Sequence, residues 1–220
     1  MRLVIRLRTG LCGAAALMLA GQAGSAVAQT APTVQAQTAQ AQTTQAQPAQ
    51  PMPQPAPPLR IIDEIKLGLL AHDIPLFGHH REGGEDVNAE VLFTSPSFLR
   101  YIWSPRPHFG VDANGSGNTS NYYAGLTWGG VFYRPGWSRG DGFFGYFSEG
   151  GSVNDGKIST TDPTRKSLGS HVLFKEGLDL GYQLNDVISV AAYLDHISNA
   201  GLANRNEGLT SAGMRIGYKF

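Results

Sequence analysis

His196 and Ser198 are the two side chains of this sequence whose types and spacing point most directly to chemistry. They stand two positions apart in the segment 194–201. On a β-strand, alternate residues share a face with Cα atoms roughly 6.5–7 Å apart, which lets an imidazole nitrogen meet a serine hydroxyl. Such a pair is the core of a nucleophile activated by a general base. The spacing fits equally well two polar residues that mark the end of an apolar face, so it leaves both interpretations open.

The elements that would hold this pair are short strands separated by turn residues. Hydrophobicity alternates in runs of about ten residues, and no stretch of 59–220 sustains a helical period with caps. We therefore predict an all-β fold, with Gly150 and Gly151 forming a turn after the fifth strand. The eight predicted strands are 64–72, 87–95, 107–114, 123–133, 142–149, 171–184, 187–197 and 211–220.

Each predicted strand has an apolar face and a polar or small-residue face. In the sixth strand, Leu178 and Leu180 alternate with Asp179 and Gly181. A β-sandwich would bury the apolar face, whereas a transmembrane barrel would turn it toward lipid and keep small or polar residues inside. Since His196 continues the apolar parity of the seventh strand, a barrel would point it into the membrane at the outer edge.

Three features favour the barrel over the sandwich. Strands of about 9–11 residues suit a tilted span of a bilayer, and aromatic residues near several strand ends fit an interfacial girdle. The chain also ends in an alternating strand whose last residue is Phe220, which resembles the terminal signal of bacterial outer-membrane proteins. We predict an eight-stranded antiparallel transmembrane β-barrel in the outer membrane of a Gram-negative bacterium. The even number of strands places the start of the first strand and the end of the last strand on the periplasmic side.

The sequence before the barrel is predicted to contain a targeting segment and a spacer. Residues 1–28 have a basic start, a short apolar stretch and an Ala-Val-Ala end, so we predict a signal peptide cleaved after Ala28, with a membrane anchor as the alternative. Residues 29–58, almost wholly Gln, Ala, Thr and Pro, are predicted to be a disordered spacer, or else a partner-binding arm. The barrel domain then covers 59–220.

Charge and cysteine content narrow the class of protein. The chain has 17 basic and 17 acidic residues, and removing the three arginines of the signal peptide leaves 14 minus 17, or −3. This balance argues against a nucleic-acid partner. The single Cys12 lies in the signal peptide, so it excludes a disulfide framework and a cysteine-based zinc site.

The segment 196–202, followed by 206–209 and a final strand, resembles the lipid A 3-O-deacylase (PagL-like) family. The resemblance is closest over about 195–220, and elsewhere it concerns the architecture. It implies a serine esterase that removes the 3-O-linked hydroxyacyl chain from lipid A of lipopolysaccharide in the outer leaflet. In that family pattern Ser198 is the nucleophile and His196 the base. The oxyanion and substrate groups are carried over as Asn199, Gly201 and Asn206.

The sequence departs from the family at the acid that orients the histidine. That acid normally falls fourteen residues after the histidine, where this chain has Thr210. Glu207 lies three residues earlier and is predicted to take the role by folding back, with a Ser–His dyad as the alternative. Asp195 is adjacent to the histidine but is predicted to face the barrel interior. The acid matters, because its loss can cost a triad about 10⁴ in rate.

Two other function classes stay open: a non-enzymatic structural or adhesin-type barrel, and an acyl hydrolase or acyltransferase acting on phospholipid. No metal and no other cofactor is expected for the esterase, and a homodimer is the alternative to a monomer. His79, His80, Glu82 and neighbouring acids could suggest a metal site. Their spacing matches no defined zinc pattern, so we predict that the segment is a solvated first hairpin loop.

Overall fold

The computed structural model describes residues 60–220. The predicted signal peptide (1–28) and spacer (29–58) lie outside the described residues. No helix within the described part is long and apolar enough to cross a membrane.

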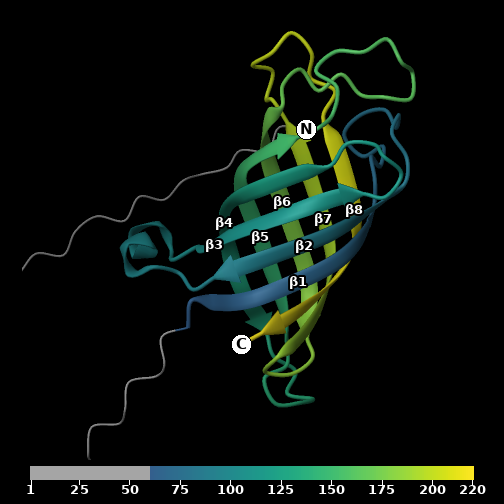
Figure 1. Cartoon of the computed structure of the whole chain (residues 1–220). Coiled ribbons are helices and arrows are strands. Elements are labelled where there is room, and N and C mark those ends of the chain that lie inside the picture. The colour runs from purple at the N-terminus through teal and green to yellow at the C-terminus, as the bar shows by residue number, and fades with distance from the viewer. Residues whose placement is uncertain (1–59) are drawn as a thin grey trace, which may run out of the picture. The chain divides into compact units, whose positions relative to one another are not determined.

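The described residues form one closed barrel of eight strands, in which each strand pairs antiparallel with the next and β1 closes on β8 (Figure 1). A 3-10 helix, η1 (Ser97–Ile102), stands between β2 and β3. The strands are β1 (Ile62–Ala71), β2 (Glu85–Phe93), β3 (Arg106–Asn114), β4 (Asn121–Tyr133), β5 (Gly142–Asn154), β6 (Val172–Gln183), β7 (Ile188–Ser198) and β8 (Leu209–Lys219).

The eight predicted strands are confirmed, but the predicted turn at Gly150 and Gly151 is wrong. Both glycines lie inside β5, which continues to Asn154. Gly150 pairs with Gly125 of β4, and a Cβ at Gly150 would lie 2.2 Å from the Ala124 carbonyl oxygen. These glycines therefore allow two strands to approach closely, a use of glycine that resembles a turn signal in the sequence.

The two faces of the barrel wall follow the predicted alternation. Side chains such as Leu180, Met214 and Ile216 face outward and are exposed, while Asp179 and Arg215 between them are buried in the interior. In the interior, Lys66 pairs with Asp179 (Nζ–Oδ2 2.8 Å). Lys175 in turn pairs with Asp112 (2.8 Å) and Asp195 (2.6 Å). An apolar exterior around an ion-paired interior is the arrangement of a transmembrane barrel.

The two ends of the barrel differ in their connections. We call "loop end" the end formed by the connections 72–84, 115–120, 155–171 and 199–208, and "terminal end" the opposite one, where β1 begins and β8 finishes. In Figure 1 the connections of the loop end rise together above the strands. At the terminal end the β6–β7 turn is short, but the β2–β3 connection 94–105 is long and carries η1.

Candidate active site

His196 and Ser198 face outward because the residue between them anchors the strand inward. Ile197 is fully buried and packs with Leu168, Leu173 and Leu209 at the loop end of the barrel. Side chains alternate along a strand, so burial of Ile197 turns both of its neighbours to the outer face, where each is half-buried. The predicted shared face of the pair is therefore present in the fold.

Thr210 holds the ring of His196 from the neighbouring strand. The two residues are register partners on β7 and β8, and the Nδ1 atom of His196 lies 2.8 Å from the Thr210 Oγ1. If Nδ1 carries the proton, the ring donates to the hydroxyl oxygen and leaves Nε2 as the basic nitrogen. Thr210, at the position where the family pattern has its acid, thus contacts the ring nitrogen that an orienting acid would bind.

Phe77 and Gly208 also contact the imidazole of His196, and together with Thr210 they form what we call its seat. The Phe77 ring meets His196 edge-on, with centroids 5.5 Å apart and planes at 76°. A Cβ on Gly208 would lie 2.6 Å from Cε1 and 2.8 Å from Nε2 of His196, so only glycine leaves room for the ring. In the sequence, Gly208 is part of the segment 206–209 that resembles the family, but nothing there shows why a glycine is needed. The sequence carries no signal for Phe77, which comes from the first hairpin loop.

Ser198 ends β7 on the same face as His196. Its Oγ accepts a hydrogen bond from the Ala200 backbone N–H at 3.4 Å. Within residues 60–220 its hydroxyl makes no hydrogen bond to His196. Catalytic hydrogen bonds are often formed only once substrate is bound, and a serine Oγ changes position by rotation between staggered χ1 wells.

The three predicted oxyanion residues come together in the loop 199–208. The Asn199 N–H donates to Oδ1 of Asn206 (3.0 Å), and the Gly201 N–H donates to Oδ1 of Asn199 (2.9 Å). The Asn199 side-chain amide also donates to the Leu168 carbonyl (2.9 Å) in the loop 155–171. These bonds shape the turn after Ser198, and they leave the Asn206 NH₂ group without a hydrogen-bond partner among residues 60–220.

Glu207 is placed differently from what its predicted role requires. Its Oε2 accepts a hydrogen bond from the Ser167 N–H (2.6 Å), and its Oε1 lies 3.0 Å from an Arg81 guanidinium nitrogen. Because Thr210 occupies Nδ1 of His196, a role for Glu207 as the orienting acid stays a prediction that requires its carboxylate to leave both partners. Asp195 faces the interior as predicted, where it pairs with Lys175.

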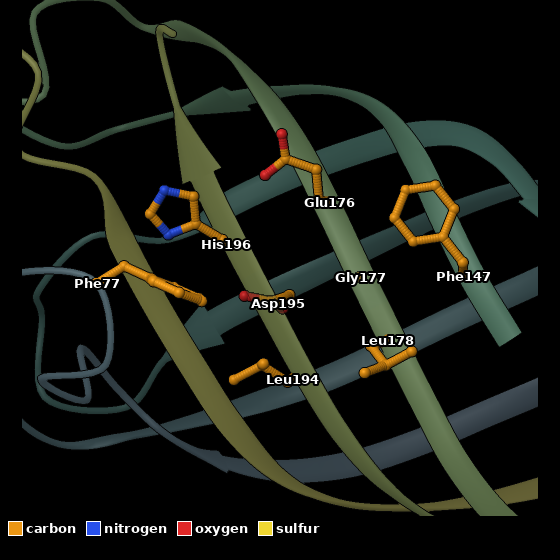
Figure 2. Close-up of a pocket in the computed structure, with 8 residues that line it drawn as sticks. All are labelled: Phe77, Phe147, Glu176, Gly177, Leu178, Leu194, Asp195 and His196. Carbon is orange, nitrogen blue, oxygen red and sulfur yellow. The ribbon is translucent and has the colours of Figure 1, made fainter. Parts of the chain in front are cut away.

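An apolar groove of about 490 Å³ runs along the outer face beside His196. Figure 2 shows the imidazole at its upper end, with Phe77 on one side and Phe147 on the other. The lining continues through Leu178 and Leu194. A groove of this kind accommodates a hydrocarbon chain rather than a polar ligand.

The prediction of a solvated first hairpin loop is confirmed at the tip, where residues 75–80, including His79 and His80, are exposed, but it is wrong for two of the acids. Glu82 and Asp86 are buried on either side of His72, whose ring nitrogens lie 3.3 Å and 2.8 Å from their carboxylates. Burial alone would lower the pKa of His72, but the hydrogen bonds to Asp86 and Glu82 outweigh it and raise the pKa to about 9. For the same reason the pKa of Glu82 falls to about 2 although burial opposes this. The acids serve a buried histidine instead of water.

This cluster ties the loops around the site. Glu82 also accepts hydrogen bonds from the backbone N–H groups of Thr119 (3.0 Å) and Lys166 (2.9 Å), so it joins three connections of the loop end. The Lys166 ammonium lies 2.6 Å from Asp73 and donates to the Gly208 carbonyl at 2.6 Å. The position of Gly208, and with it the seat of His196, is therefore fixed from the loop 155–171.

Comparison with known proteins places the chain among outer-membrane barrels. The model of the family described as "Lipid A 3-O-deacylase (PagL)" matches residues 99–219. The crystal structure of the outer membrane enzyme PagL is 14% identical, covers 71% of this chain and 99% of that chain, and has a TM-score of 0.54. The N-terminal β-barrel domain of Pseudomonas aeruginosa OprF is 11% identical, with 72% and 98% covered and a TM-score of 0.42. No curated protein matches the chain.

Proposed function

The chain belongs to the lipid A 3-O-deacylase family, and from this premise we propose that it is an outer-membrane esterase in which Ser198 and His196 remove the 3-O-linked acyl chain of lipid A. The observation that supports these two residues is their shared outward face beside the apolar groove. Catalytic groups on that face meet a substrate that lies in the outer leaflet, and they have no role toward the barrel interior.

The proposed reaction proceeds in two halves. Oγ of Ser198 attacks the ester carbonyl carbon while its proton moves to Nε2 of His196. The tetrahedral intermediate collapses as the bond to the 3-oxygen of the sugar breaks, and that oxygen takes the proton from His196. A water molecule then loses a proton to His196 and attacks the acyl-serine. The proton returns to Oγ as the 3-hydroxy fatty acid leaves.

The loop 199–208 supplies the donors for the oxyanion in this proposal. Asn199 and Gly201 fix the turn that follows the nucleophile, and Asn206 presents its NH₂ group on the side away from Asn199. Preorganised donors of this kind strengthen as negative charge develops on the carbonyl oxygen, and loss of one typically costs about 10²–10³ in rate. The chemistry requires no metal ion.

The groove beside His196 binds the acyl chain that is cleaved. Its lining of Phe77, Phe147, Leu178 and Leu194 follows the barrel wall away from the loop end. A chain lying there points from the loop end into the bilayer while its ester stays near His196. The lipopolysaccharide molecule is therefore the partner that the site fits, and a homodimer stays a prediction.

Mass spectrometry of lipid A tests the proposal. Cells producing the wild type should lose one 3-hydroxyacyl chain from lipid A, whereas Ser198→Ala and His196→Asn should leave its mass unchanged, since losing either member of a nucleophile–base pair costs on the order of 10⁴ or more. Heat-modifiable electrophoretic mobility establishes that all three are folded. An unchanged lipid A mass with folded wild type would exclude the activity, and release of fatty acid from phospholipid alone would favour a phospholipase instead.

A further inference from the structure

Glu176 stands directly opposite His196 on the strand that does not carry Thr210. The two residues are register partners on β6 and β7, and both face outward. Side chains paired in this way have Cβ atoms about 4.5–5.5 Å apart. A glutamate is long enough to reach an imidazole across that gap, directly or through one water molecule. Figure 2 shows the carboxylate and the imidazole on adjacent strands at the same end of the groove, which both line.

The carboxylate of Glu176 has no partner among residues 60–220. It makes no hydrogen bond or ion pair there, unlike the interior carboxylates of Asp179 and Asp195, which both bind cations. Its register partner on β5 is Glu149, a second outward carboxylate, and like charges directly opposite each other destabilise a sheet. An ionisable group on a membrane-facing surface is costly and points to function. Structure alone gives no reason to keep Glu176.

The other charged groups around His196 are already engaged. Lys166, from the loop 155–171, holds Asp73 and the Gly208 carbonyl, and Glu207 holds Arg81. Asp195 and Lys175 pair with each other on the far side of the barrel wall. Glu176 and, one strand further away, Glu149 are the carboxylates that share the outer face with the ring.

We propose that Glu176 is a positioning residue that supplies the negative charge that the neutral Thr210 side chain lacks. This inference rests on the proposed function of Ser198 and His196. Thr210 holds the ring through Nδ1, but a neutral hydroxyl stabilises the imidazolium only weakly. A carboxylate facing the ring from β6 stabilises the positive charge that His196 gains when Ser198 attacks, and the apolar groove strengthens that attraction by excluding water. The two functions of the family acid are thus divided between two strands.

The test compares Glu176→Gln with the matched control Glu149→Gln. Rates of lipid A deacylation are measured in detergent micelles with the full-length mature protein. We expect Glu176→Gln to lower kcat about 10²-fold with KM unchanged, less than the about 10⁴-fold of an acid in direct contact. The acidic limb of its kcat/KM profile should move to lower pH, because the imidazolium loses a stabilising charge. Glu149→Gln should stay within a few-fold of wild type in kcat and in the position of that limb.

Stability separates this role from a structural one. Both substitutions remove the repulsion between Glu149 and Glu176, so the urea midpoint should be unchanged or higher in each. Glu176→Asp keeps the charge, and it should recover most of kcat and return the acidic limb toward its wild-type position.

Two outcomes would overturn the inference. One is Glu176→Gln with wild-type kcat and an unmoved acidic limb. The other is Glu207→Gln producing the loss and the shift expected of Glu176→Gln, which would assign the charge to the loop. Either result leaves the proposed function intact if Ser198→Ala is inactive, whereas an inactive folded wild type would remove the function itself.

Discussion

Charged and polar side chains on the two faces of the barrel wall differ in whether they have partners within the protein. In the interior, Asp179 binds both Lys66 (2.8 Å) and Nε of Arg215 (3.0 Å), and Lys175 binds Asp112 and Asp195. On the outer face, Glu176 has no partner within residues 60–220, and Ser198 accepts a single long hydrogen bond. A buried charge must be paired to be tolerated, so the interior groups are explained by the fold. The outer groups are explained only by a ligand.

The comparison separates residues whose substitution should destabilise the barrel from residues whose substitution should remove activity. Partners within the chain imply a contribution to stability, and their absence implies a contribution to binding or catalysis. Four substitutions or conditions test this division, beginning with the interior.

The largest effect on stability is expected from Asp179→Ala. It leaves Lys66 and Arg215 to share the single carboxylate of Glu90, at 3.8 Å and 3.4 Å, so one buried positive charge is uncompensated. This should lower the free energy of unfolding by about 3–5 kcal/mol. Urea unfolding in lipid vesicles measures this change. Glu176→Gln on the outer face serves as the control and should not lower the midpoint. An unchanged midpoint for Asp179→Ala would end the distinction between the two faces.

Gly208→Ala should impair catalysis while the barrel stays folded. The new Cβ would lie 2.6 Å from Cε1 of His196, so the ring must move, and a displacement of about 1 Å at a catalytic group costs on the order of 10² in rate. Gly130→Ala is the matched control, because nothing lies within 4 Å of a Cβ at that position. Equal kcat/KM for the two variants would mean that the seat of His196 is not tight.

Thr210→Val should have a smaller effect on the rate. It removes the hydroxyl that bonds Nδ1 of His196 at 2.8 Å while keeping the shape, and a neutral hydrogen bond is worth about 1 kcal/mol, or about fivefold to tenfold. Thr210→Ser keeps the hydroxyl and should retain most of kcat. If valine and serine gave the same kcat, the hydroxyl would have no part in orienting the ring.

The smallest expected effect is a pH-dependent change in the local stability of the loop end. The pKa of His72 is raised to about 9 from 6.5, so its contribution to stability is complete below about pH 6.5 and is lost as the pH rises through about 9. The pKa of Glu82 is lowered to about 2, so its contribution is present above about pH 4.5 and is lost as the pH falls toward 2.

Hydrogen-exchange protection factors of the segment 72–84 measure this response. They should fall above about pH 6.5 by at most about tenfold per pH unit, while protection in β6 stays constant. His72→Gln should remove the dependence on alkaline pH. A fall of equal size in β6 would indicate that the whole barrel, rather than the loop cluster, responds to pH.

Several parts of the site were within reach of the sequence, and others were not. The outward face of His196 and Ser198 follows from the parity of one strand, and the gathering of Asn199, Gly201 and Asn206 follows from their closeness along the chain. The sequence predicts Glu207 as the acid that orients His196, whereas the side chain that lies against Nδ1 is Thr210. Three residues separate those candidates, and the register between β7 and β8 selects one of them.

Residues from distant segments were beyond any pattern in the sequence. Phe77 comes from the first hairpin loop, and Glu176 lies twenty residues before His196 on another strand. The acids Glu82 and Asp86 read as a solvated loop because their partner, His72, meets them only after the hairpin folds. Contacts of this kind depend on the lengths of all the intervening turns.

The sequence by itself determined the eight strands and which face of each is apolar, because an alternation of period two is a local property of the backbone. It also determined the pair His196 and Ser198 and the side on which that pair lies. Only the tertiary structure decided what surrounds the pair. Closure of the barrel sets the register of every strand, and that register places Thr210 and Glu176 directly opposite His196 on the two strands that flank it.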